Sequence, residues 1–466
     1  MQNGIRSITG NNRREEVTSY GGMMNILVLS GGSGKRLWPL SNITRSKQFL
    51  KVLTNDEGKK ESMLQRIHRQ IRKEYADGTV IVAAPDSQRD SIYNQIGKNT
   101  ELVIEPESRN TYPAIALSCA YLHEYKNLSL EDIVIVMPVD PYAEEGYFKA
   151  FADMKTEAEK GNADLVLMGI KPTYPSAKYG YILCEKTGEN QAIRFVEKPS
   201  EEDAEKWIAQ GAWWNAGVFA FRIGFLKEIV EKDGMKFTYA YLLEHFKEME
   251  AISFDYKVTE KTKRLSMIPY NGIWKDLGTW NTLTEEMKEE NSGNARQGEG
   301  CTNTHVINEL DIPVVVLGTH DLLVAASPDG VLVSDKHKSS YLKPYVEEVE
   351  SRPMYEERRW GEYKVLDYVQ YDDNTRSLTK HLTIQKGKSI SYQLHKQRDE
   401  IWTIVDGSGE LLVDGKLRKV GRGDVAYITK GQKHAMRAIT NLHFIEVQIG
   451  KELSEEDIER FEWEWE

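Results

Sequence analysis

The chain has 466 residues, more than one ordinary hydrophobic core needs, which predicts two or three domains. Its formal net charge of -11 argues against nucleic acid or an anionic membrane surface as a partner, so any positive charge that binds phosphate must be local. The chain has three scattered cysteines and no apolar run of transmembrane length, which predicts a cytoplasmic protein. Residues 1–22 are polar and are predicted to form a disordered N-terminal extension.

A glycine-rich turn follows the first apolar run, residues 25–29, which is typical of a buried parallel strand. The turn contains three glycines and two cations: Gly31, Gly32, Gly34, Lys35 and Arg36. Glycines let backbone amides turn toward anionic oxygens and the cations add charge-assisted bonds, so the pattern predicts a phosphate-binding loop. The spacing fits neither a Walker loop nor a dinucleotide-binding loop. An ordinary tight turn is the alternative.

A longer pattern extends this loop. Gly-Gly-x-Gly-x-Arg-Leu-Trp-Pro-Leu-Ser, followed by Ser46 to Leu50, resembles the signature of sugar-phosphate nucleotidylyltransferases, and within them the mannose-1-phosphate guanylyltransferases. The second motif usually begins with proline, where this chain has Ser46. The resemblance implies GTP and mannose 1-phosphate as substrates and adds Lys47 to Arg36 as a catalytic residue.

Strands and helices alternate through the next hundred residues. A helix is predicted over 62–73, strands over 79–84, 102–105 and 133–137, and a helix over about 113–124. This order predicts an α/β fold: a Rossmann-like nucleotidyltransferase domain over residues 23–291 with a mixed, mostly parallel sheet.

Polar residues follow two of these strands. Arg109, Asn110 and Thr111 resemble the family's nucleotide-binding motif, although a helix cap explains them equally well. Asp140 follows the strand at 133–137, where a carboxylate would lie over the phosphate loop of a parallel sheet. Two carboxylates from distant segments, Asp140 and Asp276, would suit magnesium, since this metal prefers hard oxygen ligands. The segment from Trp274 to Trp280 resembles the family's Asp-Val-Gly-Ser-Trp motif, which implies that these two aspartates share the metal. Capping of the next helix is the alternative for Asp140.

The segments between these aspartates are predicted to bind the sugar phosphate. Hydrogen-bonding groups for hydroxyls and one cation for the phosphate are available from Glu197, Asn215 and Lys198, and Gly180 would let the backbone approach the ring. In this order they resemble the family's Tyr-Gly-Tyr-Ile, Phe-x-Glu-Lys-Pro and Trp-Asn-x-Gly-x-Phe motifs. A further shared element runs from Ser253 to Lys261. Each segment is also explicable as a strand edge or turn.

Short β-rich pieces over residues 292–345 predict a small β module, for which coils of a left-handed β-helix are one arrangement. We expect it to serve as a packing or oligomer surface, consistent with a homodimer. Residues 346–358 are charged and contain proline, which favours a linker.

Closely spaced strands with glycine turns over residues 359–451 predict a double-sheet β-barrel. Four residues in it stand at the spacing of the two cupin motifs: Gln393, His395, Glu400 and His434. They form a nitrogen and oxygen ligand set suited to zinc or another divalent metal. A cupin that has lost its metal and stabilises an assembly is the alternative.

This domain resembles the type II mannose-6-phosphate isomerase part of bifunctional proteins. The resemblance implies a second, isomerase activity, with Arg398 as the group that binds the substrate phosphate. Three histidines of the usual motif are missing here, and the tail over residues 452–466 is acidic rather than basic. The alternative function is a nucleotidyltransferase that acts on another hexose 1-phosphate with another nucleotide. Its cupin domain would then be a non-catalytic dimerisation module.

Overall fold

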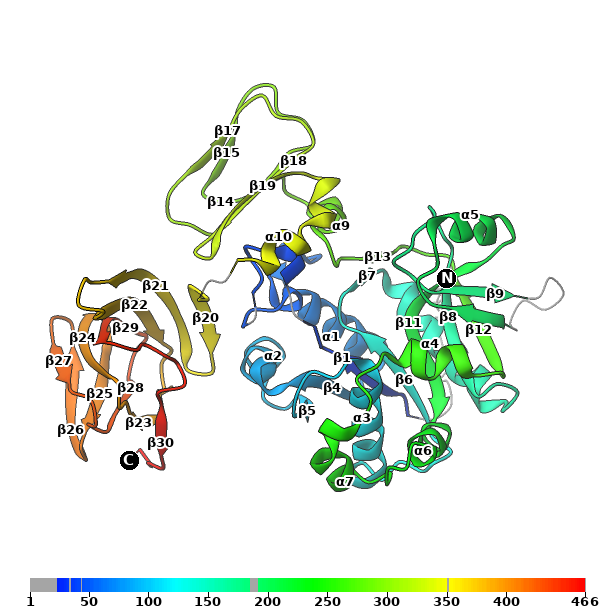
Figure 1. The fold of residues 1–466 in the computed structure, drawn as a ribbon, viewed down its shortest axis with the longest axis horizontal. Helices are drawn as coiled ribbons and strands as arrows, with labels where there is room; N and C mark the ends of the chain where they lie inside the picture. The colour runs from blue at the N-terminus through cyan, green and yellow to red at the C-terminus, as the bar shows by residue number, and fades with distance from the viewer. Residues whose placement is uncertain (1–22, 33–34, 43, 185–191, 350–351, 466) are drawn as a thin grey trace, which may run out of the picture.

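The computed structural model describes residues 23–32, 35–42, 44–184, 192–349 and 352–465. The expected disordered extension over residues 1–22 therefore lies outside the described residues. Three parts follow one another along the chain: an α/β domain, a small β module and a C-terminal domain built of strands (Figure 1). No helix among the described residues is long and apolar enough to cross a membrane.

A nine-stranded mixed sheet forms the centre of the α/β domain. Its main path runs β10-β9-β11-β6-β1-β4-β5, and β8 lies between β11 and β12 off this path. The pairs β6/β1, β1/β4 and β4/β5 are parallel, so their carboxyl ends meet at one edge, as the sequence predicts. Strand β11 is antiparallel to its neighbours. The strands are β1 (Asn25–Leu29), β4 (Thr79–Pro85), β5 (Glu101–Glu105), β6 (Ile133–Pro138), β8 (Leu165–Ile170), β9 (Tyr181–Cys184), β10 (Ala192–Val196), β11 (Trp213–Arg222) and β12 (Leu265–Tyr270).

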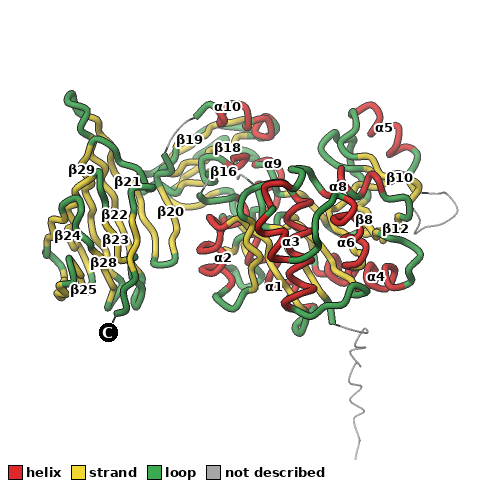
Figure 2. Tube along the Cα trace, turned by 60° about the horizontal axis from the view of Figure 1, so that its bottom comes forward, coloured by secondary structure: helices red, strands yellow, loops and turns green. Residues whose placement is uncertain are grey.

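Helices cover both faces of this sheet, because its strands carry apolar residues on both sides. One core packs α1 and α4 against the sheet, and a second core packs α3, α6 and α7 against the other face. Figure 2 shows α3 and α6 alongside the strands. Ser62 begins α1 with a capping box, in which its hydroxyl accepts from the Gln65 amide and the Gln65 side chain accepts from the Ser62 amide. The helices are α1 (Met63–Glu74), α2 (Arg89–Ile96), α3 (Thr111–Tyr125), α4 (Glu145–Glu159), α5 (Glu201–Ala209), α6 (Ile223–Lys232), α7 (Tyr239–Glu244), α8 (Phe254–Lys257) and α9 (Trp280–Glu286).

A short antiparallel ribbon joins distant parts of the domain. Strands β7 (Pro141–Ala143) and β13 (Trp274–Asp276) pair so that Asp276 lies opposite Pro141. This register places Asp276 beside Asp140, although the two are far apart in the sequence. A second ribbon pairs β2 (Leu53–Thr54) with β3 (Lys60–Glu61).

The β module stacks short strands in parallel, in register, as coils of a β-helix would. Strands β14, β16 and β18 pair in parallel, as do β15 and β17, and β19 closes the larger sheet in antiparallel. Apolar side chains of the module, including Ile307 and Leu323, join Trp280 and the loop after β1 in one core. The elements are β14 (Asn291–Gly293), β15 (Ala295–Gln297), β16 (His305–Asn308), β17 (Val314–Val316), β18 (Leu322–Ser327), β19 (Gly330–Asp335) and α10 (Lys343–Glu347).

Two antiparallel sheets form the C-terminal domain, with strand orders β20-β21-β22-β29-β24-β27 and β26-β25-β28-β23-β30. Buried residues of both sheets, such as Trp402, Met436 and Phe444, form one core between them. The strands are β20 (Tyr355–Arg358), β21 (Gly361–Gln370), β22 (Arg376–Ile384), β23 (Tyr392–Leu394), β24 (Arg398–Asp406), β25 (Ser408–Val413), β26 (Lys416–Gly421), β27 (Val425–Ile428), β28 (His434–Ala438), β29 (Leu442–Gly450) and β30 (Glu459–Phe461).

The ends of this domain differ from the expected boundaries. Strand β20 lies within the range expected as a linker, 346–358, and pairs with β21. Strand β30 lies within the expected tail, 452–466, and pairs with β23. Both segments look too charged to be strands, but edge strands tolerate charged side chains that face solvent.

Candidate functional site

The glycine loop opens directly from β1 at the carboxyl edge of the sheet. Gly32 has a φ of 112°, a conformation that favours glycine, and no atom lies within 4 Å of the position that a Cβ would take at Gly31 or Gly32. Lys35 and Arg36 begin the short helix η1 (Lys35–Leu37). Gly34 lies outside the described residues. The described part of the loop is open, as a phosphate-binding loop must be.

Lys47 and the two predicted aspartates meet beside this loop. The Nζ atom of Lys47 lies 2.5 Å from Oδ2 of Asp140, and the pair is largely buried. Asp276 is held by the backbone amide of Gly278, which donates to its Oδ1 atom at 2.8 Å. This geometry is consistent with the prediction that Asp140 and Asp276 lie close together.

The charged groups of this cluster shift one another's pKa. Burial alone would raise the pKa of Asp140, but the charge and hydrogen bond of Lys47 hold it below its usual value. Burial and the charge of Asp140 raise the pKa of Asp276 instead. Burial would lower the pKa of Lys47, and both carboxylates raise it. The charge of Arg36 lowers the pKa of both carboxylates as well. The two carboxylates supply the hard oxygen ligands that Mg²⁺ prefers.

A cavity of about 170 Å³ adjoins the two aspartates. Residues from six segments line it, including Asp140, Tyr179, Gly180, Glu197, Asn215, Gly217, Asp255, Trp274 and Asp276. A Cβ at Gly180 would collide with the Phe195 ring and the Glu197 carboxylate unless these side chains moved, so the backbone of Gly180 lies close to both. Polar groups converge on a concave surface next to the carboxylates, an arrangement suited to a small hydroxylated ligand.

Asp255 is a residue of this cavity that our sequence analysis did not select. Its Oδ1 atom accepts a hydrogen bond from Nδ2 of Asn215 at 2.8 Å. Burial and the charge of Glu197 raise the pKa of Asp255 to about 7. The available signal was the segment from Ser253 to Lys261, which resembles a motif shared by the family but had no assigned role.

The remaining sugar-site candidate, Lys198, forms an ion pair of 2.8 Å with Glu197. Its side chain is about half exposed, so it can reorient toward a ligand at little cost. Asn215, by contrast, is buried and also accepts from the Gly217 amide at 3.2 Å. Gly180, Glu197 and Asn215 therefore line the cavity, and Lys198 lies next to it through its pair with Glu197.

The residues predicted to bind the nucleotide after β5 make structural contacts in this structure. Arg109 donates to the carbonyl of Met249 and pairs with Glu107. Asn110 is the N-cap of α3, and Thr111 accepts a bond from the Phe254 amide at 2.8 Å. The alternative explanation, that Asn110 caps the helix, is confirmed. All three residues are at least partly exposed to solvent, so they can still contact a nucleotide base.

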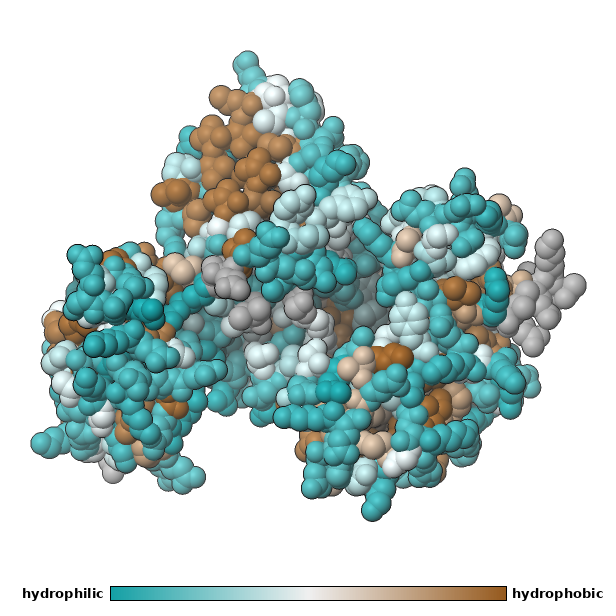
Figure 3. All heavy atoms as spheres, in the orientation of Figure 1, coloured by the Kyte–Doolittle hydropathy of each residue, from teal (hydrophilic) through white to brown (hydrophobic). Residues whose placement is uncertain are grey.

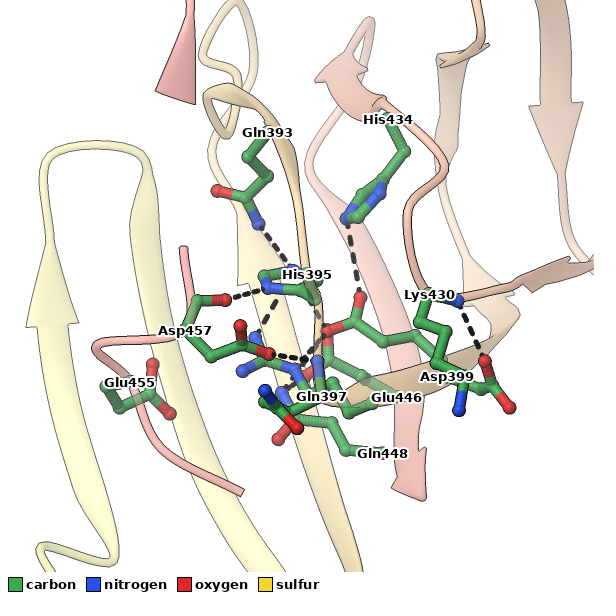
Figure 4. Close-up of polar contacts among 12 residues, drawn as sticks. Gln393, His395, Gln397, Asp399, Lys430, His434, Glu446, Gln448, Glu455 and Asp457 are labelled. Carbon is green, nitrogen blue, oxygen red and sulfur yellow. Dashed lines mark hydrogen bonds and ion pairs between the residues drawn. The ribbon is translucent and has the colours of Figure 1, made fainter. Parts of the chain in front are cut away.

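A second cluster lies inside the C-terminal domain. His395, Glu400 and His434 are buried, and each offers a ligand atom within 4.8 Å of the others. The Nε2 atom of His395 lies 3.2 Å from Glu400 and that of His434 lies 3.5 Å from it. Figure 4 shows the two rings approaching from different strands. Gln393 stands next to them, with Nε2 3.4 Å from His395 and its oxygen accepting from Ser391.

The hydrogen bonds of both histidines prepare them to bind a metal. Each ring uses its Nδ1 atom on a backbone carbonyl, that of Asp457 for His395 and that of Gln432 for His434. Burial lowers the pKa of both rings, so they are neutral at neutral pH. Nε2 of His434 and Oε2 of Glu400 are buried with no hydrogen-bond partner. These orphaned atoms face each other, and their chemistry fits a divalent metal.

Arg398 is directed at this ligand set. Its guanidinium donates to Glu400 at 2.8 Å and to the Ser454 carbonyl at 2.8 Å, and lies 3.2 Å from His395. Only 3% of its side chain is exposed. Arg398 therefore orients Glu400, and it also lines a cavity next to the cluster.

Glu446 and Gln448 are neighbours of Glu400 that sequence reasoning missed. Gln448 donates to Glu446 at 2.7 Å, and burial together with the charge of Glu400 raises the pKa of Glu446 to about 7 (Figure 4). Both residues lie in a strand of alternating apolar residues, which gave no sign of a site.

Two family models match the chain, one over each of its larger parts. Residues 25–293 match a nucleotidyl transferase family, and residues 347–463 match the C-terminal domain of mannose-6-phosphate isomerase. The first match covers more than half of the chain.

Full-length relatives are similar over both parts. The mannose-1-phosphate guanylyltransferase of Escherichia coli K12 is 31% identical, with 93% of this chain and 97% of that protein aligned. The xanthan biosynthesis protein XanB of Xanthomonas campestris pv. campestris B100 is 32% identical over 94% and 97%. A solved structure described as mannose-1-phosphate geranyltransferase from Thermus thermophilus is 29% identical, covers 71% of this chain and all of that one, and superposes with a TM-score of 0.59.

Proposed function

The chain belongs to the mannose-1-phosphate guanylyltransferases of the nucleotidyl transferase family, and from this premise we propose that it makes GDP-mannose and diphosphate from GTP and mannose 1-phosphate. The observation that carries the proposal is the meeting of Asp140, Asp276 and Lys47 between the glycine loop and a polar cavity.

The reaction requires no protein nucleophile. A phosphate oxygen of mannose 1-phosphate attacks the α-phosphorus of GTP in line, and diphosphate leaves. A phosphate dianion is nucleophilic at neutral pH, so no general base is needed, and the protein contributes positioning and charge.

Each group of residues has a role in this proposal. The loop amides at Gly31, Gly32 and Gly34, with Lys35, hold the nucleotide phosphates, and Arg109, Asn110 and Thr111 contact base and ribose. Asp140 and Asp276 hold Mg²⁺, which when bound offsets negative charge on the phosphates. Arg36 and Lys47 stabilise charge on the α-phosphate and the leaving diphosphate.

The neighbouring cavity is assigned to the sugar. Glu197 accepts hydrogen bonds from sugar hydroxyls, and Asn215 can donate to them or accept from them. The absence of a side chain at Gly180 leaves space for the sugar ring. Lys198, whose ion pair with Glu197 is exposed, turns to bind the sugar phosphate. Specificity among hexoses depends on these few bonds.

A panel of four nucleoside triphosphates against several hexose 1-phosphates, read as diphosphate release, tests the assignment. The proposal requires GTP with mannose 1-phosphate to give the highest kcat/KM. A preference for UTP or dTTP with glucose 1-phosphate would keep the enzyme class and overturn the substrates.

A second activity is proposed for the C-terminal domain, interconversion of mannose 6-phosphate and fructose 6-phosphate. The orphaned atoms of Glu400 and His434 support it, because they are placed for a metal rather than for packing. Gln393, His395, Glu400 and His434 would hold zinc or another divalent metal, which when bound polarises sugar oxygens. Metal analysis of the purified protein and a coupled isomerase assay test this, and a metal-free, inactive domain would favour a structural role.

We also propose that the chain is a cytoplasmic homodimer. Its three cysteines are free thiols, as in a reducing compartment. Figure 3 shows apolar side chains gathered on one face of the β module. Five aliphatic residues of this module are more than half exposed: Ile312, Val315, Leu317, Val331 and Val333. A second copy would remove this patch from water.

A further inference from the structure

The segment that carries the two catalytic cations lies against the β module. This segment, residues 35–42 and 44–50, includes Arg36 and Lys47, and we call it the catalytic segment. Several of its apolar side chains share a core with the module. Figure 1 shows the chain after β1, in blue, at the base of the module. The module is therefore placed to fix the position of the catalytic segment.

The turn between β18 and β19, residues 327–330, contacts the beginning of this segment. The hydroxyl of Ser327 donates to the Pro39 carbonyl at 2.7 Å. The backbone of Gly330 lies against the Trp38 ring, because a Cβ at this glycine would come within 2.5 Å of the indole. A hydrogen bond and a close backbone contact thus join the turn to the catalytic segment.

Asp329 of the same turn joins the catalytic segment to the C-terminal domain. Its Oδ2 atom accepts from Nδ2 of Asn42 at 2.7 Å, and its Oδ1 atom accepts from the backbone amide of Met354 at 2.6 Å. Met354 lies just before β20. Each oxygen of this carboxylate therefore holds a different part of the chain.

The side chain of Asn42 has one orientation that satisfies its contacts. Its Oδ1 atom accepts from the amide and the hydroxyl of Thr44, both at 2.9 Å, and from the amide of Arg45 at 2.7 Å. Rotating the amide group would lose all three bonds, so Nδ2 has to point at Asp329. The same bonds fix the backbone that leads into Lys47.

Arg45 makes a second attachment to the β module. Its guanidinium donates to both oxygens of Glu309 at 2.6 and 3.0 Å and lies 5.2 Å from the centre of the Tyr355 ring. A two-bond pair of this kind fixes direction as well as distance. Lys47 follows two residues later, with its Nζ atom 2.5 Å from Asp140. The attachment is therefore close to the metal-binding carboxylates.

We propose that Asp329 and Glu309 of the β module are positioning residues for nucleotidyl transfer. They act through Asn42 and Arg45, which hold the segment that carries the two catalytic cations. The inference rests on the guanylyltransferase function proposed above. Groups that stabilise transition-state charge have to be held within about 0.5 Å of their productive positions. A misplacement of about 1 Å can cost about 10²-fold in rate.

The first test exchanges the side chains of one contact. In Asp329→Asn the oxygen can still accept from Met354, but the new amide then faces Nδ2 of Asn42 and their bond is lost. Asn42→Asp places two carboxylates against each other. The double variant Asn42→Asp/Asp329→Asn restores the contact, because the carboxylate at position 42 keeps its bonds to Thr44 and Arg45 and accepts from the amide at position 329.

The second test changes the other attachment. Arg45→Lys keeps the charge but can make at most one of the two parallel bonds to Glu309. Asp311→Asn is the matched control. Asp311 lies in the same module, is 94% exposed and pairs at 2.8 Å with Lys364 of the C-terminal domain, so its loss breaks an interdomain contact that does not involve the catalytic segment.

Diphosphate release by the full-length protein at saturating Mg²⁺ gives kcat and KM, with the best substrate pair from the panel above. Melting temperatures are measured in parallel. Asp329→Asn, Asn42→Asp and Arg45→Lys should each lower kcat by about tenfold or more. The KM for the hexose 1-phosphate should change little, because the predicted sugar residues lie outside the catalytic segment. The double variant should regain most of kcat, and Asp311→Asn should keep the wild-type kcat.

The outcomes separate this inference from the proposed function. Wild-type kcat in Asp329→Asn and Arg45→Lys would refute the inference and keep the guanylyltransferase. Variants that fail to fold at the assay temperature, or an equal loss of kcat in Asp311→Asn, would assign these contacts to stability and overturn the positioning role. A preference for another substrate pair would change the substrates, and the variants compared with that pair would still decide the inference. A wild type that releases diphosphate with no pair would remove both.

Discussion

We expect Lys47 to compete with a metal ion for the two aspartates when no nucleotide is bound. Its Nζ atom lies 2.5 Å from Asp140, the residue that the proposed mechanism gives to Mg²⁺. We predict that Lys47→Met binds Mn²⁺, used as a probe for Mg²⁺, more tightly than the wild type in the absence of GTP while losing most of its guanylyltransferase activity.

The size of the effect follows from the charges. Two unit charges about 4 Å apart interact by about 4 kcal/mol at an effective dielectric constant of about 20. The side chains of Lys47 and Asp140 are 16% and 27% exposed, so water screens their attraction. In the wild type the Lys47 ammonium also regains water when a metal ion displaces it. We therefore expect the loss of Lys47 to improve the free energy of Mn²⁺ binding by about 1–2 kcal/mol. This converts to a Kd for Mn²⁺ that is about 5- to 30-fold lower.

Electron paramagnetic resonance of free Mn²⁺ measures the Kd, and diphosphate release measures activity. Lys51→Met, at an exposed position nearby in the sequence, is the matched control. Unchanged or weaker Mn²⁺ binding in Lys47→Met would show that the lysine and the metal do not share the aspartates.

Three further predictions test other parts of the structure. His434→Ala should lose the metal of the C-terminal domain by mass spectrometry while diphosphate release continues, whereas His443→Ala should keep the metal; metal retained by His434→Ala would contradict the ligand set. The raised pKa of Asp255, about 7, means that the folded state holds a proton more tightly than the unfolded state between about pH 4 and 7, so stability from this group falls as pH rises through that window. Asp255→Asn should therefore raise the melting temperature at pH 8 and change it little at pH 4, and equal shifts at both would refute the argument. Leu317→Asp should convert a dimer to a monomer in light scattering, while Ile273→Asp, exposed on another part of the chain, should not.

Most of the α/β domain could be predicted because its signals are local. The run at residues 133–137 is apolar enough to be a central strand, and Ser62 with Gln65 marks the start of α1. The proximity of Asp140 and Asp276 could be inferred only from the resemblance, since the β7/β13 ribbon that brings them together is two segments of three residues with no strong pattern.

The rest depends on tertiary structure. The spacing of His395, Glu400 and His434 predicted a shared site, and the structure brings them within 4.8 Å. It could not show that Arg398 also donates to the Ser454 carbonyl, because that contact depends on packing between distant segments. Strands β20 and β30 were missed because their charge is typical of linkers and tails.

The central claim is that two distant carboxylates around Lys47 hold the metal for nucleotidyl transfer. The most direct measurement is steady-state diphosphate release from GTP and mannose 1-phosphate by Asp140→Asn and Asp276→Asn at saturating Mg²⁺. Each substitution should lower kcat by about 10²-fold or more, because losing one group that stabilises transition-state charge typically has an effect of this size. Wild-type rates in both variants would contradict it.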